Sequence, residues 1–162
     1  MKSYIFLAFC GFFFIKCVVK SPTEFSKEAL EDVFISINKK EVRFKDILEE
    51  NKNKKIVIDV WASWCKDCLE SLPDVKKLQI QNPSVVFVYL SLDRDVQSWK
   101  LSVDRLNLKG EHYFMPSGWK GSLAKFLGLN YIPRYLVVSE DGKIIIFNKT
   151  KITHEVIIKA IN

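Results

Sequence analysis

Histidine and cysteine are scarce in this 162-residue chain, which contains two histidines and four cysteines. The histidines, His112 and His154, are scattered and have no ligand-like spacing, so a zinc site has little support. Basic residues are in modest excess, with a net charge of +6, and no basic stripe alternates with aromatic residues. The composition therefore supports neither a metal centre nor nucleic-acid binding.

A hydrophobic run long enough to span a membrane is also missing. The apolar run at residues 4–15 falls short of the roughly 20 residues required, but it matches the core of a signal peptide. Cys17 follows it and is typical of a lipoprotein cysteine, although Lys16 replaces the usual small residue; Cys10 is a weaker candidate. We expect residues 1–20 to be a signal peptide or a lipoprotein or membrane anchor. The protein is then exported to the periplasmic side of a bacterial cell envelope.

Beyond this leader the chain has only two cysteines, Cys65 and Cys68. The β-branched run at residues 55–60 predicts a buried strand before them. Apolar residues recur every third position after them and predict a helix: Leu69, Leu72, Val75 and Leu78. Cys65 would thus lie at a helix start, where free N–H groups and the helix dipole acidify a thiol. Cys68 would lie one turn later, close enough for a disulfide.

The cysteine pair has two other interpretations. A zinc half-site would need two more ligands, which the scattered histidines do not supply. A purely structural disulfide would close so small a loop that it would stabilise the fold little. An exported domain without other disulfides favours a catalytic pair.

Asp59 lies within the apolar strand before the cysteines. A carboxylate in that position costs free energy unless it is paired or has a function, and desolvation should raise its pKa. The other interpretation is an aspartate at a frayed strand end.

Three sequence marks carry a resemblance to a known family. The stretch from Asp59 to Cys68 resembles the W-A-x-W-C-x-x-C active-site signature of the thioredoxin superfamily. The stretch 128–138 resembles the family's cis-proline loop, with the proline at Pro133, and Pro73 matches the proline that bends the active-site helix. Within this superfamily, the marks and the flanking elements resemble the TlpA/ResA-like bacterial thiol–disulfide oxidoreductases.

The resemblance implies an α/β protein with the thioredoxin fold, in which helices flank a central mixed β-sheet. It also implies an N-terminal hairpin extension and a central insert. We expect a linker at residues 21–32, with one helical turn, and a single thioredoxin-like domain at residues 33–162. The sequence pattern predicts strands at 33–37, 41–44, 55–60, 84–92, 134–139 and 143–147, an edge-like segment at 112–116, and helices at 46–50, 95–108, 122–127 and the C-terminus.

The resemblance also assigns roles to residues around the cysteines. Asp59 aligns with the acid that moves the proton of Cys68, whereas Tyr89 stands where the family has a partner lysine, so the proton path is open. Ile132 and Pro133 would form a cis bond and dock the substrate. Trp64 would shield the thiolate and shape the docking surface, while Trp61 is expected in the core.

Two residues between the cysteines would tune the redox potential. Lys66 favours a thiolate at Cys65, and Asp67 opposes it. The family commonly has proline at the position of Asp67, so this chain departs from the pattern there.

The expected function is reduction or exchange of disulfides in exported proteins by a monomer that needs no cofactor. Cys65 attacks, Cys68 resolves, and the two form the redox-active disulfide; the electron donor is not indicated by the sequence. One alternative is a thiol peroxidase of the same fold, but its T-x-x-C motif would need threonine at Ala62. The other is a redox-inactive thioredoxin-like binding module.

Overall fold

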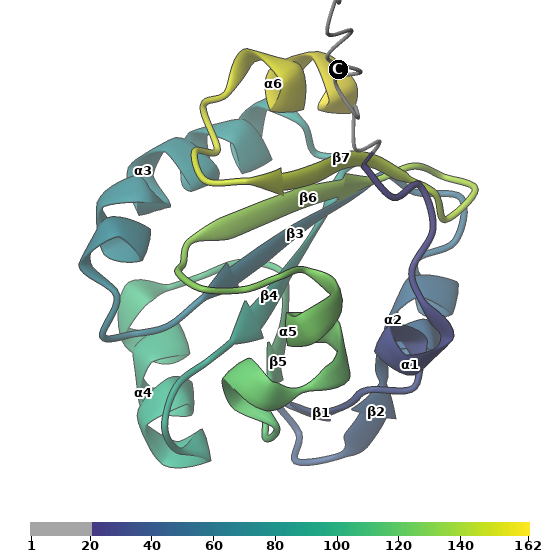
Figure 1. The fold of residues 1–162 in the computed structure, drawn as a ribbon. Helices are drawn as coiled ribbons and strands as arrows, with labels where there is room; N and C mark the ends of the chain where they lie inside the picture. Colours follow the sequence, from purple (N-terminus) through teal and green to yellow (C-terminus); the bar gives the residue numbers. More distant parts are fainter. Residues whose placement is uncertain (1–20) are drawn as a thin grey trace, which may run out of the picture.

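A seven-stranded mixed sheet runs through the computed structural model, which describes residues 21–162 (Figure 1). Its strand order is β2-β1-β5-β4-β3-β6-β7. Helices flank the sheet, which confirms the expected α/β class and thioredoxin fold. The leader at residues 1–20, with Cys10 and Cys17, lies outside the described residues. Within residues 21–162 no helix is long and apolar enough to cross a membrane.

An inner strand of the sheet, β3 (Ile56–Trp61), is buried along its whole length. It pairs in parallel with β4 (Val86–Ser91) and antiparallel with β6 (Arg134–Val138). Strands buried on both faces need helices on both sides of the sheet, which explains their nearly unbroken apolar sequence. The last strand, β7 (Ile144–Lys149), pairs antiparallel with β6.

Helices α3 (Lys66–Gln81) and α4 (Val96–Leu106) lie together on one side of the sheet, at the left of Figure 1. Lys76 Nζ of α3 donates to the carbonyl of Leu106 at the end of α4 at 2.8 Å, and Gln79 Nε2 donates to the Lys109 carbonyl just beyond α4 at 2.6 Å. Helix α3 is the connection between β3 and β4, so its first residues follow the end of β3.

The other side of the sheet carries α1 (Lys27–Leu30), α2 (Phe44–Glu50) and α5 (Ser122–Phe126). Between β5 and α5 the chain makes a short 3₁₀ helix, η1 (Gly118–Lys120). The chain ends in α6 (Glu155–Ile161), at the top of Figure 1.

The segment expected at the sheet edge is not an edge strand. β5 (Glu111–Phe114) pairs in parallel with β4 and antiparallel with β1 (Val33–Ser36), through Ile35 opposite Phe114. The N-terminal hairpin of β1 and β2 (Glu41–Arg43) extends the sheet and places the edge at β2. Its backbone pairing with β5 is the physical reason for the difference.

The expected linker at residues 21–32 is also packed onto the domain. The Phe25 ring lies 4.8 Å from the Phe44 ring and 5.6 Å from the Phe126 ring, measured between centroids. Ala29 in α1 is fully buried, and Ser26 caps α1 by accepting the Ala29 N–H at 3.2 Å. Burial of these apolar groups holds the segment in place, so the folded unit begins before residue 33.

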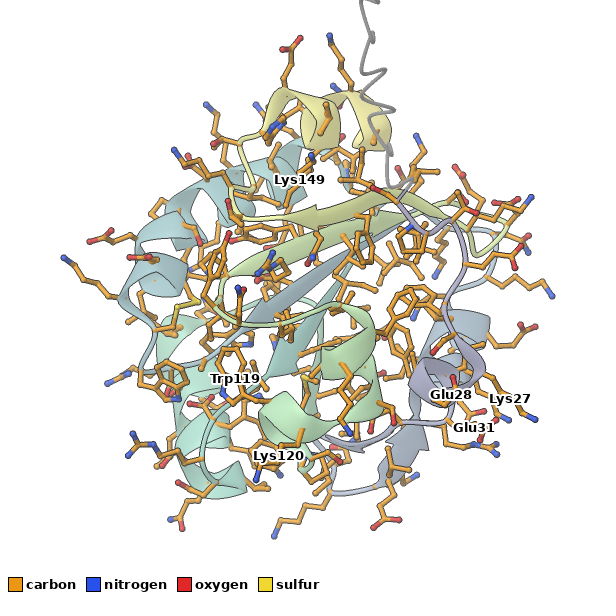
Figure 2. The ribbon with its side chains drawn as sticks, in the orientation of Figure 1. Lys27, Glu28, Glu31, Trp119, Lys120 and Lys149 are labelled. Atoms are coloured by element: carbon orange, nitrogen blue, oxygen red, sulfur yellow. A yellow bond between two sulfur atoms is a disulfide. The ribbon has the colours of Figure 1, made fainter. Side chains whose placement is uncertain are left out.

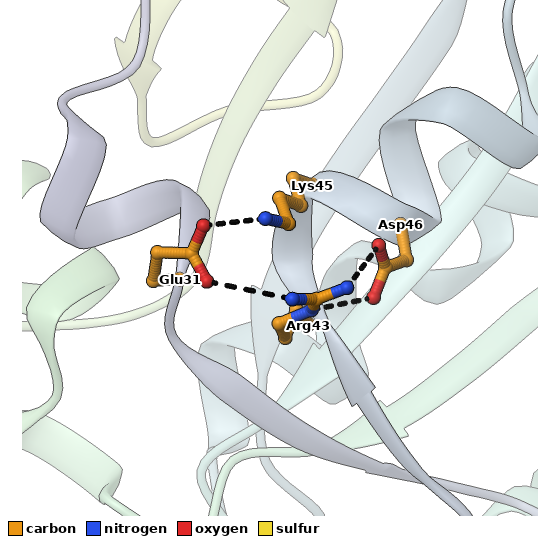
Figure 3. Close-up of polar contacts among 4 residues, drawn as sticks. All are labelled: Glu31, Arg43, Lys45 and Asp46. Carbon is orange, nitrogen blue, oxygen red and sulfur yellow. Dashed lines mark hydrogen bonds and ion pairs between the residues drawn. The ribbon is translucent and has the colours of Figure 1, made fainter.

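A chain of ion pairs joins the residue after α1 to β2 and the start of α2 (Figure 3). Glu31 pairs with Lys45 at 2.6 Å and with Arg43 at 3.8 Å, and Arg43 pairs with Asp46 at 2.9 Å. These side chains are largely exposed, and such pairs contribute little to stability. The apolar packing of Phe25 and Ala29 therefore dominates the attachment of this segment.

Candidate active site

The two cysteines lie at the junction between β3 and α3. Cys65 is the N-cap of α3, with extended backbone, and its Sγ accepts the Cys68 N–H at 3.1 Å. The two residues form a disulfide, with their Cα atoms 5.3 Å apart. The Cys65 sulfur thus lies against one of the free N–H groups of the helix start, as predicted, where negative charge is stabilised.

The two sulfurs differ in their surroundings. Cys65 is 6% exposed and lines a surface cavity of about 420 Å³, whereas Cys68 is 2% exposed and does not line it. An incoming group in this cavity therefore meets Cys65 first.

The loop before β6 lies beside the cysteines. Its Ile132–Pro133 peptide bond is cis, as the resemblance implied. The carbonyl oxygen of Ile132 lies 3.6 Å from Cys65 Sγ, and Ile132 lines the same cavity. The structure therefore brings together the two predicted parts of the site, which are far apart in the sequence.

The tryptophans divide as expected. Trp64 is 51% exposed beside Cys65, and Trp61 is buried in the core. Lys66 and Asp67 lie on the first turn of α3 and line the cavity. Lys66 Nζ lies 3.6 Å from Glu70 Oε1, so this cation contacts a carboxylate of its own helix.

Asp59 is buried in β3, with Tyr89 opposite it on β4 and Tyr135 opposite it on β6. Its Oδ1 has no hydrogen-bond partner within residues 21–162. Burial raises the pKa of Asp59 from its ordinary 3.8 to about 8, which confirms the expected burial and the direction of the shift. Burial and then the nearby Asp59 carboxylate raise the pKa of both tyrosine hydroxyls.

A hydroxyl link that the sequence did not reveal joins this strand row to the helix of Cys68. The Tyr135 hydroxyl lies 2.8 Å from Ser71 Oγ, and Ser71 Oγ donates to the Cys68 carbonyl at 2.7 Å. Tyr135 is therefore linked through Ser71 to the turn that carries Cys68, and its backbone lies opposite Asp59 in the pairing of β3 with β6.

Asp93 is a second residue that sequence reasoning missed. It is buried after β4, and its Oδ1 accepts the Ser63 N–H at 3.0 Å and the Ser63 hydroxyl at 2.6 Å. Its Oδ2 accepts the Ser91 hydroxyl at 2.7 Å. These bonds fix the loop that ends at Cys65. The signal in the sequence was the position of this acid, directly after a buried strand. A carboxylate that is buried there needs hydrogen-bond partners.

Metal binding has no candidate site in the part of the chain that the structure describes, where no three histidine, cysteine or acidic side chains converge. His112 is buried, with Nε2 3.0 Å from the Leu108 carbonyl and its ring stacked on Tyr89. It is thus a residue of the core.

Comparison with known proteins assigns the site to a family. A family model described as thioredoxin-like matches residues 52–144. Sporulation thiol-disulfide oxidoreductase A of Bacillus subtilis is 28% identical over 134 residues, which cover 82% of this chain and 78% of that protein. The thiol-disulfide oxidoreductase ResA of Bacillus thuringiensis subsp. konkukian is 26% identical over 124 residues, covering 75% and 68%.

A solved structure agrees. The solution structure of a proposed thiol-disulfide oxidoreductase from Bacteroides vulgatus is 32% identical, covers 80% of this chain and 83% of its own, and superposes with a TM-score of 0.67. This chain belongs to the thioredoxin-like family. It is a thiol–disulfide oxidoreductase enzyme, related to ResA, as the sequence predicted.

The burial of Asp59 predicts that Asp59→Asn raises the free energy of unfolding, by an amount that depends on pH. Since folding raises its pKa from 3.8 to about 8, the contribution of Asp59 to stability is full at low pH. It declines as the pH rises through about 8. We expect urea unfolding to show Asp59→Asn more stable than wild type at about pH 9, with the difference shrinking toward about pH 5. The control is Glu24→Gln, which removes one exposed surface charge. A loss of stability in Asp59→Asn at both pH values would contradict the assignment.

The hydrogen bonds of Asp93 predict that its substitution lowers both the free energy of unfolding and the alkylation rate of Cys65. Asp93→Ala should lower the free energy of unfolding by about 2 kcal/mol, because Ser63 loses its acceptor. With the loop loosened, alkylation of Cys65 at neutral pH should slow by about two- to fivefold in a Cys68→Ser background. The control is Asp95→Ala, which removes the cap that accepts Ser98 N–H at 2.8 Å but leaves the Cys65 loop untouched. An unchanged alkylation rate in Asp93→Ala would limit Asp93 to a structural role.

Proposed function

We propose that this enzyme acts as a monomer on disulfides of other exported proteins, with Cys65 as the attacking residue and Cys68 as the resolving residue. The observation that carries the proposal is the position of Cys65 at the cavity and of Cys68 behind it.

The reaction follows from the two sulfurs. In the reduced enzyme the Cys65 thiolate attacks one sulfur of a client disulfide, and the other client sulfur leaves as a thiolate that takes up a proton. Cys68 then loses its proton and attacks Cys65, which re-forms the Cys65–Cys68 disulfide and releases the second client thiol. Two electrons pass to the client, and a dithiol donor must reduce the enzyme again.

The helix start supports the first step. The Cys68 N–H that lies 3.1 Å from Cys65 Sγ donates to the thiolate, and the dipole of α3 adds to its stabilisation. Lys66 contributes less, because its ammonium is exposed and contacts Glu70.

Asp59 supports the second step as the acceptor of the Cys68 proton. A carboxylate whose pKa burial raises to about 8 can take and return a proton near neutral pH. The Tyr135 and Ser71 hydroxyls offer the route by which this proton reaches solvent, since Ser71 also lines a cavity of about 370 Å³. This route stands in for the lysine that Tyr89 replaces.

Client docking uses the cis-proline loop. The Ile132 backbone lies beside Cys65 Sγ, where an extended client segment can pair with it, and Pro133 shapes the loop. Trp64 gives an exposed aromatic surface next to the attacking sulfur.

Cysteine substitutions test the assignment of attacker and resolver. Cys65→Ser should abolish insulin disulfide reduction, because the thiolate that starts the reaction is removed. Cys68→Ser should accumulate a mixed disulfide with insulin, visible on a non-reducing gel, because the resolving thiol is missing. Accumulation in Cys65→Ser instead would reverse the two roles. Peroxide consumption without insulin reduction in wild type would favour a peroxidase, and neither activity would favour a binding module.

We also propose that the enzyme works on the periplasmic side of the envelope, held to the membrane at Cys17. The support is the apolar run at residues 4–15 and the cysteine that follows it. A lipid anchor would keep the catalytic domain near membrane-bound donors and clients.

Labelling with palmitate tests this anchor. Wild-type protein should partition with membranes and take up label, and Cys17→Ser should lose both, because it removes the acceptor thiol. Cys10→Ser is the matched control and should keep the label. Label that persists in Cys17→Ser but is lost in Cys10→Ser would move the anchor, and no label in wild type would exclude lipidation.

A further inference from the structure

Three exposed aromatic side chains gather at the attacking sulfur. Within residues 21–162, the large aromatic side chains that remain exposed are Trp64 at 51%, Tyr131 at 49% and Trp119 at 39%. All three line the 420 Å³ cavity that contains Cys65. Exposed aromatic groups that converge on one cavity mark an interaction site rather than scattered surface.

The three come from separate parts of the fold. Trp64 precedes α3, and Tyr131 belongs to the cis-proline loop. Trp119 comes from η1, in the connection between β5 and α5 (Figure 2). Trp119 has no counterpart among the residues that the sequence assigned to the site. The connection between β5 and α5 therefore adds an aromatic wall to the cavity.

Tyr131 is held in place from behind. The Arg134 guanidinium lies 4.3 Å from the centre of its ring, a cation–π contact. Arg134 is buried, and its Nη2 donates to Asn130 Oδ1 at 3.0 Å and to the Tyr131 carbonyl at 3.4 Å. This wall of the cavity is thus organised before a client arrives.

The charges around the cavity select for a neutral occupant. Lys66 and Asp67 are the charged residues in its lining, and they have opposite signs. The charged residues next to the lining, Glu70 beside Lys66 and Arg134 against Tyr131, also have opposite signs. A strongly acidic or basic segment finds no complementary field here, whereas an apolar ring finds aromatic surfaces.

We propose that this cavity binds an aromatic or large aliphatic side chain of the client, adjacent to the cysteine that Cys65 attacks, and that Trp119 is a specificity-determining residue. The proposal rests on the proposed function, since the client must enter this cavity to reach Cys65. Burial of that side chain between Trp119, Trp64 and Tyr131 holds its neighbouring sulfur at Cys65.

Peptide binding to an inactive enzyme tests the proposal apart from catalysis. The full chain with Cys65→Ser and Cys68→Ser is titrated calorimetrically with two peptides that differ only beside an S-methylated cysteine, Phe in one and Ser in the other. We expect the Phe peptide to bind about tenfold more tightly. Adding Trp119→Ala should remove most of that preference, and Trp119→Phe should retain it because the aromatic wall is kept.

The matched control is Leu101→Ala on α4, an exposed apolar residue away from the cavity, which should keep the full preference. Equal binding of the two peptides, or a preference that survives Trp119→Ala, would overturn the proposal. Tighter binding of a peptide with Glu or Lys at the same position would also overturn it. If wild type reduces insulin but the inactive variant shows no peptide preference, this inference is wrong and the proposed function stands. If the inactive variant prefers the Phe peptide but wild type does not reduce insulin, the binding surface stands and the proposed function is wrong.

Discussion

The hydrogen bond from the Cys68 N–H to Cys65 Sγ is the contact on which the rest of the site depends. It exists because β3 ends and α3 begins at this point, which leaves N–H groups without helical acceptors. The sheet fixes β3 between β4 and β6, and Asp93 fixes the loop between β3 and Cys65. The fold therefore supplies a site that stabilises negative charge at one sulfur and keeps the other beneath it.

A second constraint is the burial of Asp59, which costs stability that the chain could recover by substitution. The structure surrounds it with groups suited to proton transfer: Tyr89 and Tyr135 on the neighbouring strands, and Ser71 beyond Tyr135. A buried carboxylate that lowers stability, on the strand that leads to the cysteine pair, is consistent with selection for reactivity over stability.

The elements around the cysteines could be predicted from the sequence because their causes are local. Alternating or continuous apolar runs define β3 and β4, and the three-residue spacing defines α3. Asp59 was predictable because an acid inside an apolar strand is anomalous by itself. The cis bond at Pro133 followed from the family resemblance and not from the pattern.

What could not be predicted depends on contacts between distant residues. Periodicity shows that β5 is a strand but not that β1 pairs with its free edge. Phe25 lies in a polar stretch, and its packing on Phe44 becomes evident only in three dimensions. Trp119 is likewise brought to Cys65 by the path of the chain between β5 and α5. The strand pairing, the packing of Phe25 and the position of Trp119 all depend on the order of the sheet and on the packing of helices against it.

The pH dependence of alkylation at Cys65 tests the central claim most directly. In Cys68→Ser the backbone N–H at position 68 is retained, so the thiolate should keep its donor. The account predicts a midpoint for Cys65 below the value of about 8.5 for an unperturbed thiol, and slower alkylation of Cys68 in Cys65→Ser. A midpoint at or above about 8.5 for Cys65, or faster reaction at Cys68, would contradict it.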